Sequence, residues 1–252
     1  MKISLCQFSA VWENPEASID KIENLLAGYE KSDLLIFPEL SLTGFTMESL
    51  KFAEEIDGVS VQYFMKLAGR LKTNIFCGVI QKDDNKIYNS LFHFDEKGLI
   101  KAVYKKIHPF SYGREDKNYS AANELVVTEI NHVKIGLTIC YDLRFPELYR
   151  LYAKKGIDVL VNIANWPIPR IDHWRTLLKA RAIENQCFMI GCNRVGDDPL
   201  SKYSGSSGIF DPLGSEILSA GDKEGIFSAE INLENVSETR KKLPFLADMK
   251  LI

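Results

Sequence analysis

Short apolar runs bounded by turn-forming residues recur along the whole chain. Runs of this length that are rich in β-branched and aromatic residues are typical of β-strands. We expect strands over residues 3–8, 33–37, 74–80, 87–94, 100–106, 133–140, 159–163, 188–193, 207–210 and 226–231. Several of these runs alternate apolar and polar positions, which predicts sheets with one face on a core and the other face less buried.

Apolar residues at helical spacing separate these runs. Asn14 followed by Pro15 is an N-cap and first-turn signal, and the helical stripe after it continues to Tyr29. Periodicity and stop signals predict further helices over residues 61–71, 146–155, 171–185 and 233–242.

The order of these elements favours one α/β domain over residues 1–252. Hairpin-like neighbours such as 74–80 and 87–94 argue against a purely parallel sheet, and two packed sheets with helices outside fit the alternation better. The longest stretch without clear periodicity is 109–123, and a long irregular segment in a compact domain is often a lid or a binding loop.

Composition narrows the class of protein. The 252 residues are 46% hydrophobic and 26% charged, as in an ordinary soluble protein, and the formal net charge of −3 provides no broad basic field for nucleic acid. Five cysteines, without paired metal-ligand spacing, favour a reducing compartment over a disulfide framework or a metal site. The first ten residues predict a strand rather than a signal peptide, and no apolar run is long enough for a bilayer. We expect a cytoplasmic protein without cofactor, metal, nucleic-acid partner or membrane partner.

Three polar residues that end apolar runs are candidates for chemistry. Cys140 follows VKIGLTI at a predicted strand-to-helix turn, where a thiol is exposed beside free backbone N–H groups; a buried core cysteine is the alternative. Glu39 closes DLLIFPEL and Lys106 follows a third run, although either could be a solvated charge. His108 could act as a base for a cysteine or order its loop by hydrogen bonding.

These residues lie in segments that resemble a known family. FPELSLTGF, YKKIHPF and CYDLRFPEL are similar to the three signature segments of the nitrilase, or carbon–nitrogen hydrolase, superfamily, in the same order and at comparable spacing. The segments ANWP, HWRTLLKARAIENQ and CNRVG extend the resemblance over the chain and are most similar to the ω-amidases. The resemblance implies a four-layer αββα sandwich of two mixed sheets with helices outside, and a homodimer formed by helices on one side of the sandwich.

The resemblance also implies roles for four residues. Glu39 matches the general base, Lys106 the catalytic lysine and Cys140 the nucleophile of the superfamily. Glu115, in the irregular segment, matches a second glutamate present in many members. The implied chemistry is attack of the thiol on a small amide, with a thioester intermediate. The backbone N–H of Tyr141 and the ammonium of Lys106 would stabilise the tetrahedral oxyanion.

Substrate recognition is a separate question. Arg144 follows the cysteine by one helical turn and could bind a substrate carboxylate through two parallel hydrogen bonds, or form a structural ion pair with Asp142 or Glu147. Aromatic residues that could line the pocket, or belong to the core, are Tyr112, Trp166 and Phe45.

We therefore expect a cysteine amidase that hydrolyses a small ω-amide of a dicarboxylic acid, such as 2-oxoglutaramate or succinamate, to the acid and ammonia. The implied role is salvage of the keto acid left after glutamine transamination. The alternatives are another small-amide or N-carbamoyl hydrolase of the same superfamily, and a non-catalytic binding protein on this scaffold.

Overall fold

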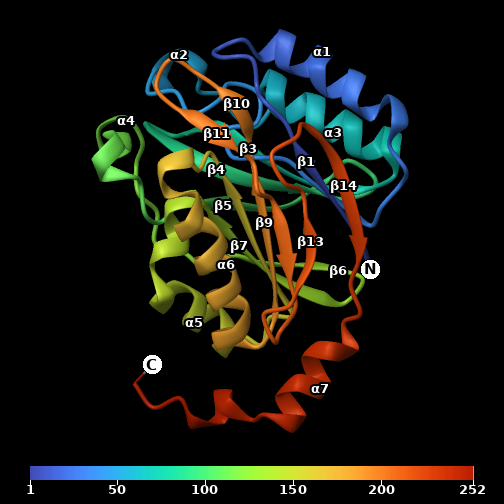
Figure 1. Cartoon of the computed structure of the whole chain (residues 1–252). Helices are drawn as coiled ribbons and strands as arrows, with labels where there is room; N and C mark the ends of the chain where they lie inside the picture. Colours follow the sequence, from blue (N-terminus) through green and yellow to red (C-terminus); the bar gives the residue numbers. More distant parts are fainter. Residues whose placement is uncertain (252) are drawn as a thin grey trace.

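Two six-stranded sheets pack face to face in the computed structural model, which describes residues 1–251 (Figure 1). The first sheet has the order β14-β1-β2-β3-β4-β5 and the second β13-β12-β9-β8-β7-β6. The first contains β1 (Lys2–Gln7), β2 (Leu34–Ile36), β3 (Asn74–Asp83), β4 (Lys86–Phe94), β5 (Ile100–Lys105) and β14 (Gly225–Glu230). The second contains β6 (Val127–Ile130), β7 (Val133–Ile139), β8 (Val159–Ala164), β9 (Phe188–Asn193), β12 (Gly208–Phe210) and β13 (Glu216–Ser219).

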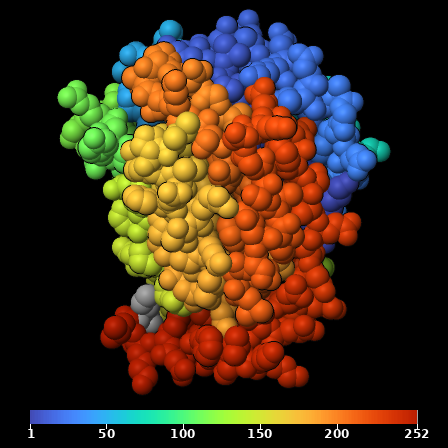
Figure 2. Space-filling model, in the orientation of Figure 1, coloured from blue at the N-terminus to red at the C-terminus, as the bar shows by residue number. Residues whose placement is uncertain are grey.

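Both sheets are mixed. In the first, β1, β2 and β3 run parallel, whereas β14, β4 and β5 join antiparallel. In the second, β7, β8 and β9 run parallel and the outer strands are antiparallel. A separate hairpin is formed by β10 (Val195–Asp197) and β11 (Lys202–Ser204). Figure 2 shows the orange surface of this hairpin region beside the yellow surface where α6 (Ile171–Asn185) begins.

Helices cover the outer faces of the sandwich. An apolar cluster joins α1 (Pro15–Leu25) and α3 (Val59–Leu71) to the first sheet, and another joins α5 (Pro146–Lys154) and α6 to the second. The remaining helices are α2 (Ser49–Phe52), α4 (Glu115–Asn118) and α7 (Glu234–Lys242). Short 3-10 turns are η1 (Leu26–Gly28), η2 (Ser111–Gly113), η3 (Cys140–Arg144), η4 (Ile168–Arg170) and η5 (Phe245–Asp248).

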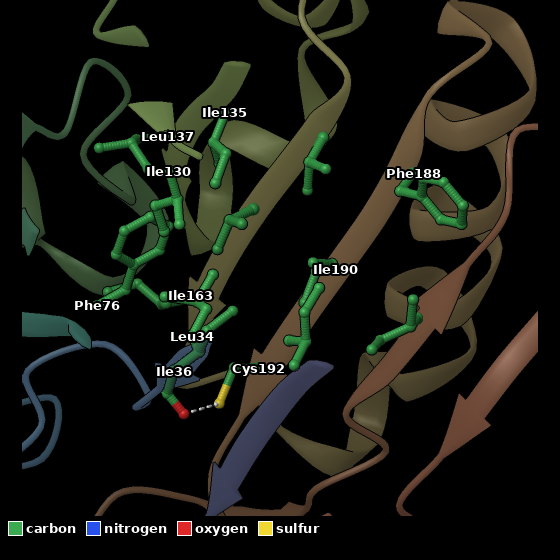
Figure 3. Close-up of a cluster of buried hydrophobic side chains, with 14 of the residues drawn as sticks. Leu34, Ile36, Phe76, Ile130, Ile135, Leu137, Ile163, Phe188, Ile190 and Cys192 are labelled. Carbon is green, nitrogen blue, oxygen red and sulfur yellow. Dashed lines mark hydrogen bonds between the residues drawn. The ribbon is translucent and has the colours of Figure 1, made fainter. Parts of the chain in front are cut away.

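A third apolar cluster fills the space between the two sheets (Figure 3). Leu34, Ile36 and Phe76 of the first sheet face Ile163 and Ile190 of the second, and all of these side chains are fully buried. Since each sheet is covered on both sides, its central strands are apolar on both faces. This arrangement confirms the predicted αββα sandwich of two mixed sheets.

Several local predictions need correction. The expectation of one less-buried sheet face is wrong for β8 and β9, because every residue of these strands is buried. The strands β6, β10, β11 and β13 were not predicted, because they are short and lack clear alternation. The segment predicted to be irregular contains η2 and α4. Within residues 1–251, no helix is both long and apolar enough to cross a membrane.

Candidate active site

Cys140 lies at a sharp turn where β7 ends and η3 begins. Its φ of 45° is in the left-handed region, which a residue with a side chain seldom adopts. Backbone strain of this kind clusters at functional sites, where the surrounding structure holds it. The side chain is half-buried, whereas the other four cysteines of the chain are buried. Cys140 therefore combines the predicted strand-end position with access to solvent.

A buried cluster of one ammonium and two carboxylates lies close to this thiol. Lys106, which follows β5, has its Nζ 2.8 Å from Glu39 Oε1 and 2.8 Å from Glu115 Oε2. All three side chains are at most 1% exposed. The alternative that Glu39 and Lys106 are solvated charges is therefore wrong. The structure brings Glu39, Lys106 and Glu115 together from three separate segments.

Neighbouring amides hold the two carboxylates in place. Asn89 Nδ2 donates to Glu39 Oε1 at 2.7 Å and to Glu115 Oε1 at 2.8 Å. The backbone N–H of Asn165 donates to Glu39 Oε2 at 2.8 Å, and that of Phe110 donates to Glu115 Oε2 at 2.6 Å. Such bonds to ionised groups are stronger than neutral ones and fix the direction of each carboxylate.

The turn that carries Glu39 rests directly on β3. Ser41 N donates to the carbonyl of Gly78 at 2.8 Å, and Gly78 N donates to Ser41 Oγ at 2.9 Å. A Cβ on Gly78 would lie 2.2 Å from Leu40 N and 2.9 Å from Glu39 Cα. Glycine is therefore needed here, because the turn approaches the strand too closely for a side chain.

The charges of the cluster shift three pKa values. Burial by itself would lower the pKa of Lys106, but Glu115 and Glu39 outweigh it and raise that pKa well above its usual value. Burial raises the pKa of Glu115, against the opposing effect of Lys106 and with a further increase from Glu39. Burial, then Glu39, raises the pKa of Cys140, although Lys106 lowers it in part. The resting site therefore holds a protonated lysine and a neutral thiol.

A cavity of about 690 Å³ opens onto Cys140. Its lining includes every residue predicted to bind substrate: Phe45, Tyr112, Tyr141, Arg144 and Trp166. Tyr112 is 86% exposed at the rim, whereas Trp166 is only 2% exposed. The volume is within the usual range for small-molecule sites.

Two arginines on the cavity wall have no carboxylate partner among residues 1–251. Arg144 stacks over the Trp166 ring at 4.7 Å, and Arg170 lies 5.5 Å from the Phe110 ring. Neither guanidinium forms an ion pair with a carboxylate of residues 1–251. The alternative that Arg144 pairs with Asp142 or Glu147 is therefore wrong. Burial, then the positive charge of Arg170, lowers the pKa of Arg144, as expected for two cations that face one space.

The His108 ring contacts a carboxylate and an aromatic ring. Its Nδ1 lies 2.8 Å from Asp142 Oδ1, and its ring stacks on Phe145 with centroids 3.8 Å apart. Of the two alternatives from the sequence, the structure supports ordering of the loop by hydrogen bonding.

Sequence reasoning missed several residues of the site. Asn89 lies in KIYNSLFHF, and a buried amide within an apolar strand was a signal that could have identified it. Asn165 and Arg170 lie in and after the ANWP segment, which had been used only for the family resemblance. The hairpin residues that line the cavity, Asp198 to Tyr203, had no sequence signal. Asp198 is already paired with Arg194 at 3.0 Å.

Comparison with known proteins identifies the family of this site. The carbon-nitrogen hydrolase family model matches residues 2–241. A 2-oxoglutaramate amidase of Bacillus subtilis (strain 168) is 38% identical over 251 residues, which cover 98% of this chain and 97% of the relative. The omega-amidase YafV of Escherichia coli (strain K12) is 33% identical over 250 residues, which cover 98% of this chain and 96% of the relative.

Solved structures agree with this assignment. One is XC1258 from Xanthomonas campestris, a CN-hydrolase superfamily protein with an arsenic adduct in the active site. It superimposes with a TM-score of 0.94 at 32% identity, and the match covers 100% of this chain and 98% of XC1258. Saccharomyces cerevisiae Nit3, of the nitrilase superfamily, gives a TM-score of 0.86 at 26% identity, with 97% and 94% covered. The chain therefore belongs to the carbon-nitrogen hydrolase family and is an enzyme of that class.

Proposed function

We propose that this enzyme is a cysteine amidase that hydrolyses a small ω-amide of a dicarboxylic acid, such as 2-oxoglutaramate or succinamate. Cys140 is the nucleophile, Glu39 the general base, and Lys106 the group that stabilises negative charge. The observation that carries the proposal is the buried ion cluster of Lys106, Glu39 and Glu115 beside a half-buried thiol at a strained turn. The cluster has two carboxylates but only one lysine, so the charge of one carboxylate is not neutralised, and that carboxylate is available to take a proton.

In the first step, Glu39 takes the proton of the Cys140 thiol as the sulfur attacks the amide carbon. A new C–S bond forms, and the carbonyl electrons move onto oxygen. The ammonium of Lys106 and the backbone N–H of Tyr141 stabilise that oxyanion, and a lost donor of this kind typically costs about 3 kcal/mol in the barrier. The oxyanion then collapses, the C–N bond breaks, and Glu39 delivers its proton to the departing ammonia.

In the second step, water hydrolyses the thioester. Glu39 removes a proton from water, the hydroxide adds to the thioester carbon, and the C–S bond breaks. The thiolate of Cys140 then regains the proton from Glu39, so the site returns to its resting charge. Glu115 holds Lys106 through two contacts, at 3.0 and 2.8 Å, and so keeps the ammonium in place through both steps.

The two arginines, which pair with no carboxylate among residues 1–251, support an acidic substrate. Arg144 and Arg170 line the same cavity as Cys140, and a carboxylate at the far end of the amide would satisfy them. The names of the relatives from Bacillus subtilis and Escherichia coli are consistent with this class of amide.

Ammonia release from a panel of amides tests the proposal. The panel contains 2-oxoglutaramate, succinamate, glutamine, asparagine and a neutral aliphatic amide, with Cys140→Ala as the control. Release from the first two compounds that disappears in the variant would support both the substrate class and the nucleophile. Release only from the neutral amide, or from an added N-carbamoyl compound, would retain the nucleophile and overturn the substrate. Activity that persists in Cys140→Ala would overturn the mechanism.

Variants of the arginines test the carboxylate contact. Arg144→Lys keeps the charge but loses the two-pronged geometry. Because hydrogen bonds to charged groups contribute about 1.5–3 kcal/mol, kcat/KM for succinamate should fall about 10- to 100-fold relative to the neutral amide. Arg175→Gln is the matched control, since Arg175 is exposed on α6 and pairs with Glu216 outside the cavity. Unchanged selectivity in Arg144→Lys and in Arg170→Gln would remove the arginines from substrate recognition.

A further inference from the structure

Asp142 is a fully buried carboxylate that the proposed mechanism does not use. Its Oδ1 accepts from the backbone N–H of His108 at 3.0 Å and is 2.8 Å from His108 Nδ1. Its Oδ2 accepts from Tyr104 Oη at 2.7 Å and from Ile139 N at 2.9 Å. No lysine or arginine among residues 1–251 pairs with it. The negative charge is therefore stabilised by four hydrogen-bond contacts, all from two short segments.

These contacts lie on either side of two proposed catalytic residues. Tyr104 and His108 are each two positions from Lys106, and Ile139 and Asp142 bracket Cys140. Lys106 follows the edge strand β5 of the first sheet, whereas Cys140 follows β7 of the second. No ladder of backbone hydrogen bonds joins β5 to β7, so the sheets themselves do not fix the separation of the two strand ends.

We infer that Asp142 is a positioning residue, which joins the strand end that carries Lys106 to the turn that carries Cys140. This inference rests on the proposed roles of those two residues. The bond from Ile139 N holds the start of the strained turn, and the bonds from His108 and Tyr104 hold the segment around the lysine. This carboxylate thereby helps to set the distance between the thiol and the ammonium, together with the contacts of Glu39 and Glu115 to Lys106.

The two side-chain donors are themselves fixed. His108 stacks on Phe145 with an interplanar angle of 9°, which keeps Nδ1 directed at Asp142. Tyr104 is fully buried, and burial followed by Asp142 raises the pKa of its phenol, so the hydroxyl stays protonated and donates. The contact is preorganised, because neither ring can turn away without losing its packing.

The test is Asp142→Asn in the full-length chain. The substitution keeps the shape of the side chain but removes its charge. It also replaces one accepting oxygen by an NH₂ group, which cannot accept the hydrogen bonds that this oxygen received. A misplacement of roughly 1 Å can lower a rate about 100-fold, so we expect kcat to fall by about that factor while KM changes less than about threefold. Alkylation of Cys140 by iodoacetamide should also slow by about tenfold, because the thiol and its base no longer align.

Asp158→Asn is the matched control. Asp158 Oδ2 accepts from Lys134 N at 3.0 Å, at the opposite end of strand β7 from Cys140, and neither residue is among those that line the cavity. Its kcat and alkylation rate should match those of the parent enzyme. His108→Gln, which retains a side-chain donor, should keep more activity than His108→Ala, and Tyr104→Phe should lower kcat without raising KM.

The outcomes separate the inference from the proposed function. If Cys140→Ala abolishes ammonia release but Asp142→Asn keeps the parent kcat, the positioning role is overturned and the proposed function stands. If Cys140→Ala remains active, the proposed function fails first. If Asp142→Asn does not fold, Tyr104→Phe and His108→Gln decide the question, and parent-like kcat and alkylation rates in both would overturn the inference.

Discussion

The close approach of the Glu39 turn to Gly78 makes Gly78→Ala a quantitative probe of the site. The added Cβ would meet Leu40 N at 2.2 Å and the Glu39 carbonyl carbon at 2.8 Å. These are backbone atoms, so no side-chain rotation relieves the contact. An ordinary contact begins at 3.4 Å, and the difference, 3.4 − 2.2, means that the turn must recede by 1.2 Å or the strand must bend.

That displacement is large relative to what the site tolerates. Glu39 is held by hydrogen bonds of 2.7 to 2.8 Å from Asn89, Lys106 and Asn165, and a displacement of the turn changes the geometry of these bonds. A shift of roughly 1 Å in a catalytic group can cost about 100-fold in rate. Overpacking a core position typically costs about 1–3 kcal/mol in stability. We therefore expect a folded variant with kcat lowered about 100-fold.

Steady-state ammonia release on the best amide of the panel, together with thermal unfolding, measures both effects. Gly69→Ala is the control, because its Cβ would lie 3.6 Å from Lys97 O, an ordinary contact. Gly69 is within α3, where alanine is favoured over glycine by about 1 kcal/mol, so this variant should be slightly more stable and fully active. A Gly78→Ala enzyme with parent kcat and reduced stability would refute the link between this contact and Glu39.

Three further predictions concern stability, reactivity and assembly. Burial lowers the pKa of His93 to about 4 from 6.5, so between these values only the unfolded chain gains the proton. Stability should therefore fall by about 3 kcal/mol as the pH drops through that range. The free energy of unfolding, measured with urea at several pH values, should lose this pH dependence in His93→Gln. It should keep it in His132→Gln, a control at an exposed histidine. Mass spectrometry after limited alkylation should find Cys140 modified first, and prior labelling of any buried cysteine would contradict the structure. The predicted homodimer should appear in light scattering. Leu151→Glu on α5 and Ile183→Glu on α6 should weaken it, because these side chains are 41% and 45% exposed and available to a partner; a monomeric parent enzyme would refute the prediction.

The sequence predicted those features of the fold that depend on local patterns. The helix after Asn14 begins as expected, since Asn14 Oδ1 accepts from Ala17 N at 3.0 Å and Pro15 occupies the first turn. The hairpin of β3 and β4 and the central parallel strands also agree with the apolar runs. Glu39, Lys106, Glu115 and Cys140 were identified through the family resemblance. On their own, Glu39 and Lys106 could have been solvated charges and Cys140 a core cysteine, and Glu115 had no signal besides the resemblance.

The rest of the site depends on contacts between distant segments. Asn89 binds Glu39, which is 50 positions away in the sequence, and Glu115, which is 26 positions away. Asn165 binds Glu39 across 126 positions. Polar residues of this kind have no periodic signature, since their partners are set by the packing of two sheets. Ile183 shows the converse limit: it lies in a segment whose apolar spacing predicted the helix, but its side chain is 45% exposed and is not part of the face that α6 buries.

The charges of the site give a physical reason for the direction in which an acidic amide would bind. Glu39, Glu115 and Lys106 together carry one excess negative charge, and burial makes a second one costly, which is why Cys140 rests as a thiol. Transfer of the thiol proton to Glu39 leaves that total unchanged, so the nucleophile is generated without additional buried charge. A substrate carboxylate placed beside this cluster would add a second buried negative charge, which is unfavourable. Arg144 and Arg170 provide the complementary positive wall in the same cavity. The amide end of a dicarboxylic ω-amide should therefore point toward Cys140 and its carboxylate toward the arginines, so that lengthening the chain between the two groups should reduce kcat/KM once both ends can no longer be satisfied together.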